Sequence, residues 1–202
     1  MTDSPADRLG GRDLRGWRQV RCGACGLPPR LCVCATLPVI ETRARVMIVM
    51  HVIEAVRSTN TGRLVARMLP RASLHLRGAR DGVREPVPEG RRLVLFPSEG
   101  ARPLRPDDAG DDLILVVPDG TWAQARRVHR RDPLAIGAEA VTLPSIGASS
   151  YGLRRSVREG GLCTLEAVAA ALGVLEDARA ESSLCEAFAR WRARAEAVRA
   201  GG

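Results

Sequence analysis

The sequence predicts an α/β protein in which an open sheet is flanked by helices. Two apolar runs of strand length, residues 46–50 and 113–117, each end in a polar turn that leads into a helix-like segment. Hydrophobic residues make up 45% of the chain but aromatic residues only 3%, so the core must be built from Leu, Val, Ala and Ile. Ligands of open α/β sheets bind in the crevice at the strand ends, which directs attention to these turns.

The run at residues 113–117 is rich in β-branched residues and is bounded by two aspartates and a proline, as expected for a strand buried on both faces. The turn after it reads Pro118, Asp119, Gly120, Thr121 and Trp122. The proline fixes one φ, the glycine permits a tight turn, and the acid or the threonine can cap a helix that begins near the tryptophan. The turn is therefore either a plain helix cap or a catalytic and ligand-binding junction.

Residues 46–50 are the first predicted strand, and it ends at His51. After it comes a polar turn and then a helix that stops at Pro70; the turn consists of Thr59, Asn60, Thr61 and Gly62. This turn offers a cap and exposed backbone amides that can bind an anion or a carboxylate. His51 is either a satisfied histidine at the end of a strand or a base.

The same alternation continues to the end of the chain. Further strands are predicted over 73–76, 92–96 and 139–143, a loop over 102–108, and helices over 122–131 and 163–172. Asp132 and Pro133 end the first of these helices, and Thr164 lies at the start of the second. A last helix is expected to pack through one apolar stripe, formed by Leu184, Phe188, Trp191, Ala195 and Val198. Cys163 and Cys185 are expected to be inert buried residues.

The charge balance favours a polyanionic partner. All 31 basic residues are arginines, against 23 acidic residues, which gives a net charge of +8 and an isoelectric point near 10.3. Without lysine the chain has no Schiff-base lysine, no pyridoxal phosphate anchor and no lysine-containing phosphate loop. GC-rich coding would explain the missing lysine but not the basic excess. The helix over 122–131 carries four arginines that are either merely solvated or bind phosphates, the reading we favour: Arg126, Arg127, Arg130 and Arg131.

Neither a membrane span nor a signal peptide is expected. No apolar run approaches the ~20 residues that cross a bilayer. Residues 1–8 contain acids and no apolar core, and residues 1–20 are expected to be flexible. We therefore expect a cytoplasmic protein without a membrane partner.

Four of the six cysteines lie within thirteen residues, at Cys22, Cys25, Cys32 and Cys34. The first two form a C-x-x-C knuckle, whose glycines allow the turn that directs both sulfurs at one ion. A structural zinc site with four cysteine ligands is predicted, because a catalytic zinc keeps an open position and usually has histidine or carboxylate ligands. A redox-active C-x-x-C is the alternative. The C-x-C half also leaves open whether Cys34 is the fourth ligand.

Taken in order, these motifs resemble the DTW-domain family of tRNA-uridine aminocarboxypropyltransferases. The resemblance covers residues 22 to about 170 and rests on the four cysteines; His51, Glu54, Arg57 and Thr59 to Gly62; Phe96, Pro97, Ser98 and Glu99; Asp119, Gly120, Thr121 and Trp122; Tyr151, Leu153, Arg154 and Arg155; and Thr164, Glu166 and Ala167. Any one of these motifs is weak by itself. Their common order along the chain is specific.

The resemblance implies a SPOUT-like domain over 43–202 with a C-terminal trefoil knot that binds S-adenosylmethionine, preceded by a flexible N-terminus and zinc module over 1–42. It also implies transfer of the 3-amino-3-carboxypropyl group of S-adenosylmethionine to N3 of a tRNA uridine, with a variable-loop uridine suggested by the bacterial-looking zinc module.

The residues provide a mechanism for that reaction. Asp119 is the hypothetical base, desolvated by Trp122 and Pro118, with Glu99 and Glu54 as alternatives. Arg154 would hold the carboxylate of the donor, and Ser98 with Glu99, or Thr59 with Asn60, its ammonium group. Leu143 and Pro144 would hold the adenine. The other implied contacts to the donor are Thr61, Gly62, Phe96, Pro97, Gly120, Thr121, Tyr151, Leu153 and Thr164, and the implied contacts to RNA are Arg57, Arg155 and the four helical arginines.

Two other functions fit the same motifs. A SPOUT-like RNA methyltransferase would use the same co-substrate but would release S-adenosylhomocysteine. A zinc-containing RNA-binding protein would need no chemistry at Asp119. The sequence decides neither the target uridine nor whether the protein is a monomer or a homodimer.

Overall fold

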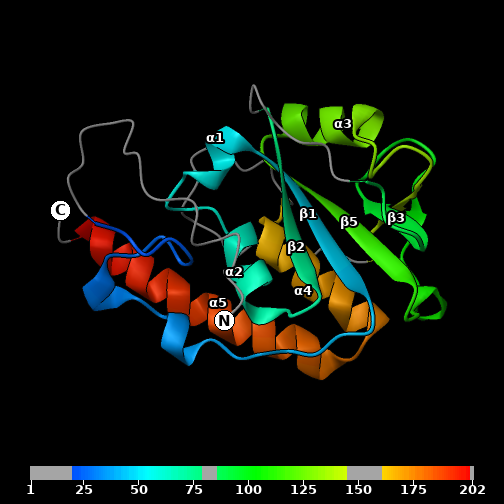
Figure 1. Cartoon of the computed structure of the whole chain (residues 1–202). Helices are drawn as coiled ribbons and strands as arrows, with labels where there is room; N and C mark the ends of the chain where they lie inside the picture. The colour runs from blue at the N-terminus through cyan, green and yellow to red at the C-terminus, as the bar shows by residue number, and fades with distance from the viewer. Residues whose placement is uncertain (1–19, 79–85, 145–160, 201–202) are drawn as a thin grey trace.

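The structure is a computed structural model that describes residues 20–78, 86–144 and 161–200. Within these ranges a parallel sheet of six strands has the order β2-β1-β5-β3-β6-β4. The strands are β1 (Arg45–His51), β2 (Ala72–Arg77), β3 (Arg91–Leu95), β4 (Arg102–Pro103), β5 (Leu113–Asp119) and β6 (Glu139–Thr142). The α/β class predicted from the sequence is confirmed, and β1 and β5 lie side by side within the sheet (Figure 1).

Strand β5 is buried on both faces, as the sequence predicts. Leu113, Leu115 and Val117 belong to the larger hydrophobic cluster, whereas Ile114 and Val116 belong to the smaller one. Successive side chains of a strand point to opposite faces, so each cluster lies on one face of the sheet. The larger cluster includes residues of α2, α4 and α5, and α3 packs against the smaller one (Figure 1).

The helices agree with the predicted positions, with small shifts at their ends. They are α1 (Val52–Ala55), α2 (Gly62–Met68), α3 (Trp122–Arg131), α4 (Thr164–Leu175) and α5 (Ala178–Ala200). Helix α3 ends at Arg131, with Asp132 as its C-cap before Pro133, as predicted. Helix α4 continues beyond the predicted residue 172, and its N-cap is Cys163, which leaves the Thr164 side chain for another contact. The apolar stripe of α5 is confirmed, since Leu184, Phe188, Trp191 and Ala195 are buried and Val198 is half-buried.

Residues 102–108 were expected to be a loop, but they contain β4 and the short 3-10 helix η4 (Pro106–Asp108). Arg102 explains the difference, because its guanidinium donates hydrogen bonds to Asp108 and to Glu139 of the neighbouring β6. Glu139 lies 37 residues further along the chain, beyond the reach of a local sequence pattern. The prediction that Cys163 and Cys185 are buried is also wrong: Cys163 is half-buried, and Cys185 is exposed, one residue from the buried Leu184 and therefore on a different face of α5.

The N-terminal cysteine segment packs onto the core of the sheet domain. It contains the 3-10 helices η2 (Pro29–Leu31) and η3 (Cys34–Thr36), and it runs beside α5 (Figure 1). Cys25, Leu27 and Val33 join the larger hydrophobic cluster, and the Trp191 indole N–H donates a hydrogen bond of 2.8 Å to the Cys25 carbonyl. The module is thus attached to the sheet domain by both apolar and polar contacts.

The predicted flexibility of the N-terminus concerns residues outside the described ranges, and so do the predicted roles of Tyr151, Leu153, Arg154 and Arg155. Among the described helices, none is both long and apolar enough to cross a membrane.

Candidate functional site

The polar loops picked out by the sequence follow strands whose carboxyl ends lie at one edge of the sheet. Met50 pairs with Asp119 in the register of β1 and β5, so these two strands end together. Phe96 follows β3, and Leu143 follows β6, which is paired to β3 in parallel. Because all the described strands are parallel, their loops are brought to the edge where α/β sheets bind ligands.

Asp119 is the residue on which these loops converge. It is 3% exposed, its Oδ2 accepts a hydrogen bond of 2.7 Å from the Asn60 side-chain amide, and its Oδ1 accepts one of 2.8 Å from the Thr164 hydroxyl. The backbone of Gly62 lies so close to this carboxylate that a side chain would not fit there, since a Cβ at that position would lie 2.6 Å from Oδ2. Three segments that are distant in sequence therefore meet at one carboxylate.

The turn before α2 is enclosed, although its amides were expected to be exposed. Asn60 and Thr61 are 1% and 3% exposed. The side-chain oxygen Oδ1 of Asn60 accepts a hydrogen bond from the backbone N–H of Arg63, and the Thr61 hydroxyl accepts one from the backbone N–H of Leu165. Both side chains are used to join α2 to β5 and α4. Whether this turn touches a ligand remains a prediction.

Trp122, the first residue of α3, belongs to an aromatic group with Phe96 and His129. Its ring is 6.1 Å from that of Phe96, and Phe96 stacks on His129 at 5.0 Å. Phe96 belongs to the smaller hydrophobic cluster, whereas Val117, which shares a strand face with Asp119, belongs to the larger one. The hydrogen-bond partners of the Asp119 carboxylate, Asn60 and Thr164, come from the α2 and α4 side of the sheet. The tryptophan, 41% exposed, keeps much of its ring at the surface.

The other candidate acids differ in their surroundings. Glu54 is fully buried, and its Oε1 lies 3.3 Å from Nε of the half-exposed Arg57. Glu99 is exposed, next to the half-buried Ser98 and the exposed Pro97. His51 fits the first of its two predicted roles, a hydrogen-bonded histidine at the end of a strand. Its Nδ1 accepts a hydrogen bond from the backbone N–H of Ile53 and caps α1.

The remaining predicted residues of the site divide into two groups. The described ones near the edge are the half-buried Pro118, Gly120 and Leu143 and the exposed Thr121 and Pro144. The hydroxyl of Thr121 caps α3 by accepting a hydrogen bond from the backbone N–H of Gln124. The others lie outside the described residues: Tyr151, Leu153, Arg154 and Arg155.

The four predicted cysteines form one cluster. Their sulfur atoms all lie within 4.8 Å of one another; Cys22 and Cys34 are 3.6 Å apart and Cys25 and Cys32 are 3.7 Å apart. A tetrahedral zinc ion with Zn–S bonds of about 2.3 Å requires sulfurs about 3.8 Å apart, which these spacings match. Cys34 therefore fits as the fourth ligand, and no outside group is needed.

The electrostatics of the cluster suit a metal. Burial raises the pKa of Cys22, but hydrogen bonds from backbone N–H groups of Cys25 and Ala24 and from neighbouring cysteines outweigh it and lower the pKa to about 7. Burial is the main reason why the pKa of Cys25 and that of Cys34 are raised. Thiols whose pKa is raised in this way need a compensating positive charge in order to ionise, and a bound cation would provide it.

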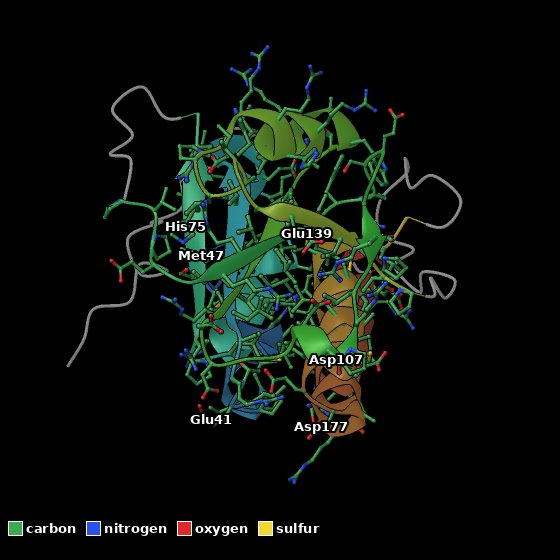
Figure 2. The ribbon with its side chains drawn as sticks, turned by 90° about the vertical axis from the view of Figure 1, so that its right-hand side faces the viewer. Glu41, Met47, His75, Asp107, Glu139 and Asp177 are labelled. Atoms are coloured by element: carbon green, nitrogen blue, oxygen red, sulfur yellow. The ribbon has the colours of Figure 1, made fainter. Side chains whose placement is uncertain are left out.

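Helix α3 presents its arginines to solvent. Arg126, Arg127, Arg130 and Arg131 are all exposed, and nitrogen-tipped side chains extend outward from this helix in Figure 2. The predicted solvent-facing basic surface is therefore present.

Arg63 was not among the predicted site residues, but it is 8% exposed and lies between the cysteine cluster and Asp119. Burial lowers its pKa, while the charges of Cys25, Cys22 and Asp119 oppose that shift. In the sequence it is one more arginine in a basic helix. The only local signal is its place three residues after Asn60, where an asparagine side chain can accept from a backbone N–H at a helix start.

The comparisons with known proteins agree with these motifs. The model of the DTW domain matches residues 19–195. The chain is 30% identical over 170 residues to tRNA-uridine aminocarboxypropyltransferase 2 of Drosophila melanogaster, which covers 79% of this chain and 68% of the fly protein. For the protein of the same name from Macaca fascicularis the identity is 28% over 187 residues, covering 86% of this chain and 63% of the relative. The chain thus spans about two thirds of the length of these curated relatives.

A plant relative and one solved structure are also similar. The chain is 28% identical over 205 residues to tRNA-uridine aminocarboxypropyltransferase A of Arabidopsis thaliana, covering 82% of this chain and 75% of that protein. The SAM-dependent rRNA acp-transferase Tsr3 of Vulcanisaeta distributa matches with a TM-score of 0.46 and 21% identity, over 71% of each chain. Since the family model matches most of the chain and the ordered motifs are present, this protein belongs to the DTW domain family.

Proposed function

We propose that this protein transfers the 3-amino-3-carboxypropyl group of S-adenosylmethionine to N3 of a tRNA uridine and releases methylthioadenosine. The fly and Arabidopsis relatives are named for uridine aminocarboxypropyl transfer. The observation that carries the proposal is the junction at Asp119, where the turn at Asn60 and the start of α4 at Thr164 meet the end of β5 through direct hydrogen bonds. These are three of the ordered motifs of the family.

The transfer is a substitution at carbon. The N3 nitrogen forms a bond to the γ-carbon of the donor, the bond from that carbon to sulfur breaks, and its electron pair converts the sulfonium into the thioether of methylthioadenosine. The N3 proton must leave, and we assign its final acceptor as Asp119. Because Asp119 is only 3% exposed and the Thr164 hydroxyl donates to its Oδ1, Thr164 passes the proton: it gives its own to Oδ1 as it receives the one from N3. The buried Glu54 and the exposed Glu99 are the weaker candidates.

The donor must present its γ-carbon, and not its methyl group, to the uridine. We assign its carboxylate to Arg154, its adenine to Leu143 and Pro144, and its ammonium group to Ser98 and Glu99, since the alternative Asn60 uses its amide inside the protein. In this proposal the C-terminal part of the domain forms a trefoil knot of the SPOUT kind that binds the donor.

We assign tRNA to the exposed arginines of α3 and to Arg57 and Arg155. Phosphate contacts of this kind supply affinity and orientation without sequence specificity. We assign Zn²⁺ to the cysteine cluster, where four thiolates would close its coordination and leave a purely structural role.

The test is to incubate the purified protein with S-adenosylmethionine and unmodified tRNA and to identify both products by mass spectrometry. We expect methylthioadenosine and a uridine heavier by one aminocarboxypropyl group, with Asp119→Asn abolishing both. Asp107→Asn is the matched control, because Asp107 is an exposed aspartate of η4 (labelled in Figure 2).

Two results would contradict the proposal. Release of S-adenosylhomocysteine would identify a methyltransferase. Tight tRNA binding without either product, unchanged in the Asp119 variant, would identify an RNA-binding protein without catalytic activity.

A further inference from the structure

Arg63 connects the cysteine cluster to the loop that holds Asp119. Its guanidinium donates hydrogen bonds of 3.1 Å to the Gly23 carbonyl and 2.8 Å to the Arg57 carbonyl. Gly23 lies inside the C-x-x-C knuckle, and Arg57 begins the turn that leads to α2. One buried side chain of α2 thus ties the turn before this helix to a knuckle residue that lies 40 positions before Arg63 in the sequence.

A second contact joins the same two segments. Gly26 has a φ of +72°, and a Cβ at this position would lie 2.6 Å from the Ser58 carbonyl oxygen and 2.9 Å from Nη2 of Arg63. Both the positive φ and the closeness require glycine here. The knuckle therefore packs directly against the backbone of the turn, in addition to the hydrogen bonds of Arg63.

The connection continues to Asp119 through Asn60. The backbone N–H of Arg63 donates 3.2 Å to Oδ1 of Asn60, whose Nδ2 donates to Asp119. On its other side the knuckle is anchored by Trp191, which donates to the Cys25 carbonyl. The knuckle is thus held by α5 on one side and supports the Asp119 junction through Arg63 on the other.

We propose that Arg63 is a positioning residue through which metal occupancy of the cysteine cluster sets the affinity for S-adenosylmethionine. Without a metal the knuckle sulfurs are no longer held together, and the Gly23 carbonyl moves. A buried guanidinium that loses a partner is costly, so Arg63 and the turn at residues 57–60 shift with it. The coupling acts through a shared hydrogen-bond chain, and by linkage S-adenosylmethionine also strengthens metal binding.

This inference rests on the proposed function in one respect, namely that S-adenosylmethionine binds beside Asp119. The experiment measures its dissociation constant by calorimetry, without turnover, for the protein with Zn²⁺ and after chelation. The variants are Arg63→Met, Gly26→Ala and the control Arg92→Met. Arg92 is a suitable control because its guanidinium likewise donates to two backbone carbonyls, those of Pro133 and Leu134, in a different part of the fold.

We expect Arg63→Met and Gly26→Ala to bind S-adenosylmethionine about tenfold more weakly, within the usual range of coupling between sites. Each should still contain one Zn²⁺ per chain and bind tRNA as the unaltered protein does. Chelation should weaken binding by a similar factor in the unaltered protein and in Arg92→Met. It should have little further effect in Arg63→Met, because the connection is already broken. Arg63→Lys, which keeps one donor group, should be intermediate.

Three results would overturn the inference. The first is equal affinity for S-adenosylmethionine in Arg63→Met and the unaltered protein, and the second is that chelation and Arg63→Met weaken this binding additively. The third is loss of Zn²⁺ from both Arg63→Met and Gly26→Ala. If the unaltered, metal-loaded protein binds no S-adenosylmethionine, the proposed function fails as well. Binding that is strong but indifferent to Arg63 and to chelation contradicts the inference alone.

Discussion

The side-chain amide of Asn60 donates a hydrogen bond of 2.7 Å to Oδ2 of Asp119, across 59 residues of sequence, and both residues are buried. The same Asn60 accepts from the backbone of α2, so it holds the helix start and the carboxylate in one arrangement. Because the junction is enclosed, each of its hydrogen bonds matters for stability as well as for chemistry.

Asn60→Ala should therefore lower the free energy of unfolding by about 1–3 kcal/mol, the cost of leaving a buried charged group short of a donor. It should also weaken binding of S-adenosylmethionine, measured by calorimetry. Thr42→Ala is the control, since the buried Thr42 hydroxyl donates to the Ala44 carbonyl outside the site. It should affect stability but not binding, and a binding loss in the control would argue against a specific role of Asn60.

Thr164 allows the proton route to be separated from the packing around it. Thr164→Val keeps the shape but removes the hydroxyl that donates to Asp119, so kcat should fall by about 10²-fold or more, as for other losses of a proton-transfer group. Thr164→Ser keeps the hydroxyl and should retain most of the activity. Single-turnover rates would test this, and equal rates for the two variants would exclude the hydroxyl from the reaction.

The cysteine cluster and the two cysteines outside it should differ in metal content. Cys25→Ser should lose most of the bound Zn²⁺ and lower the melting temperature, since ligand loss removes folding free energy. Cys185→Ser, at an exposed position of α5, should change neither. Elemental analysis of the purified variants measures the metal directly. A full complement of metal in Cys25→Ser would show that the ion is bound elsewhere.

Replacing the four arginines of α3 by glutamine should weaken tRNA binding and make it less sensitive to salt. Each phosphate contact that is lost should reduce the slope of log K against log salt concentration by about 1. Arg190 and Arg192 are suitable controls, because each lies near a glutamate of its own helix, Glu186 and Glu196, at 3.9 and 3.6 Å. An unchanged slope after the α3 replacements would mean that tRNA binds to another surface.

Asp108 should make the stability of the protein sensitive to acid. Hydrogen bonds from Arg102 lower the pKa of Asp108 from 3.8 to about 2, with help from the backbone N–H of Arg105 and the charge of Arg91. A carboxyl whose pKa is lower in the folded state stabilises the fold at pH values above its unfolded pKa. Its contribution of about 2 kcal/mol is lost as the pH falls from about 4 to about 2.

Asp108→Asn should remove that acid-dependent part of the stability. Chemical denaturation at several pH values would show a flatter decline between about pH 4 and pH 2 than in the unaltered protein. A decline of the same steepness in both proteins would place the acid-sensitive group elsewhere.

Local patterns in the sequence determined much of the fold. The β-branched run of β5, the proline after α3 and the apolar stripe of α5 are short-range signals, and each element lies where they predict. The four cysteines were identified by spacing alone, and their sulfurs do converge. Such features depend on residues a few positions apart, so neighbouring sequence is sufficient to predict them.

Tertiary structure alone decided how these elements combine at the site. The hydrogen-bond partners of Asp119 were not predicted: strand alternation turns its carboxylate toward α2 and α4, where Asn60 and Thr164 bind it. The one local signal for Arg63, its place three residues after Asn60, predicts a backbone hydrogen bond but not that its side chain lies between the cysteine cluster and Asn60. Strand β4 likewise depends on the contact between Arg102 and Glu139. The sequence by itself therefore determined which motifs are present and at which strand ends they lie. Which side chains meet depended on sheet order and on the face to which each residue points, because those contacts join residues far apart along the chain.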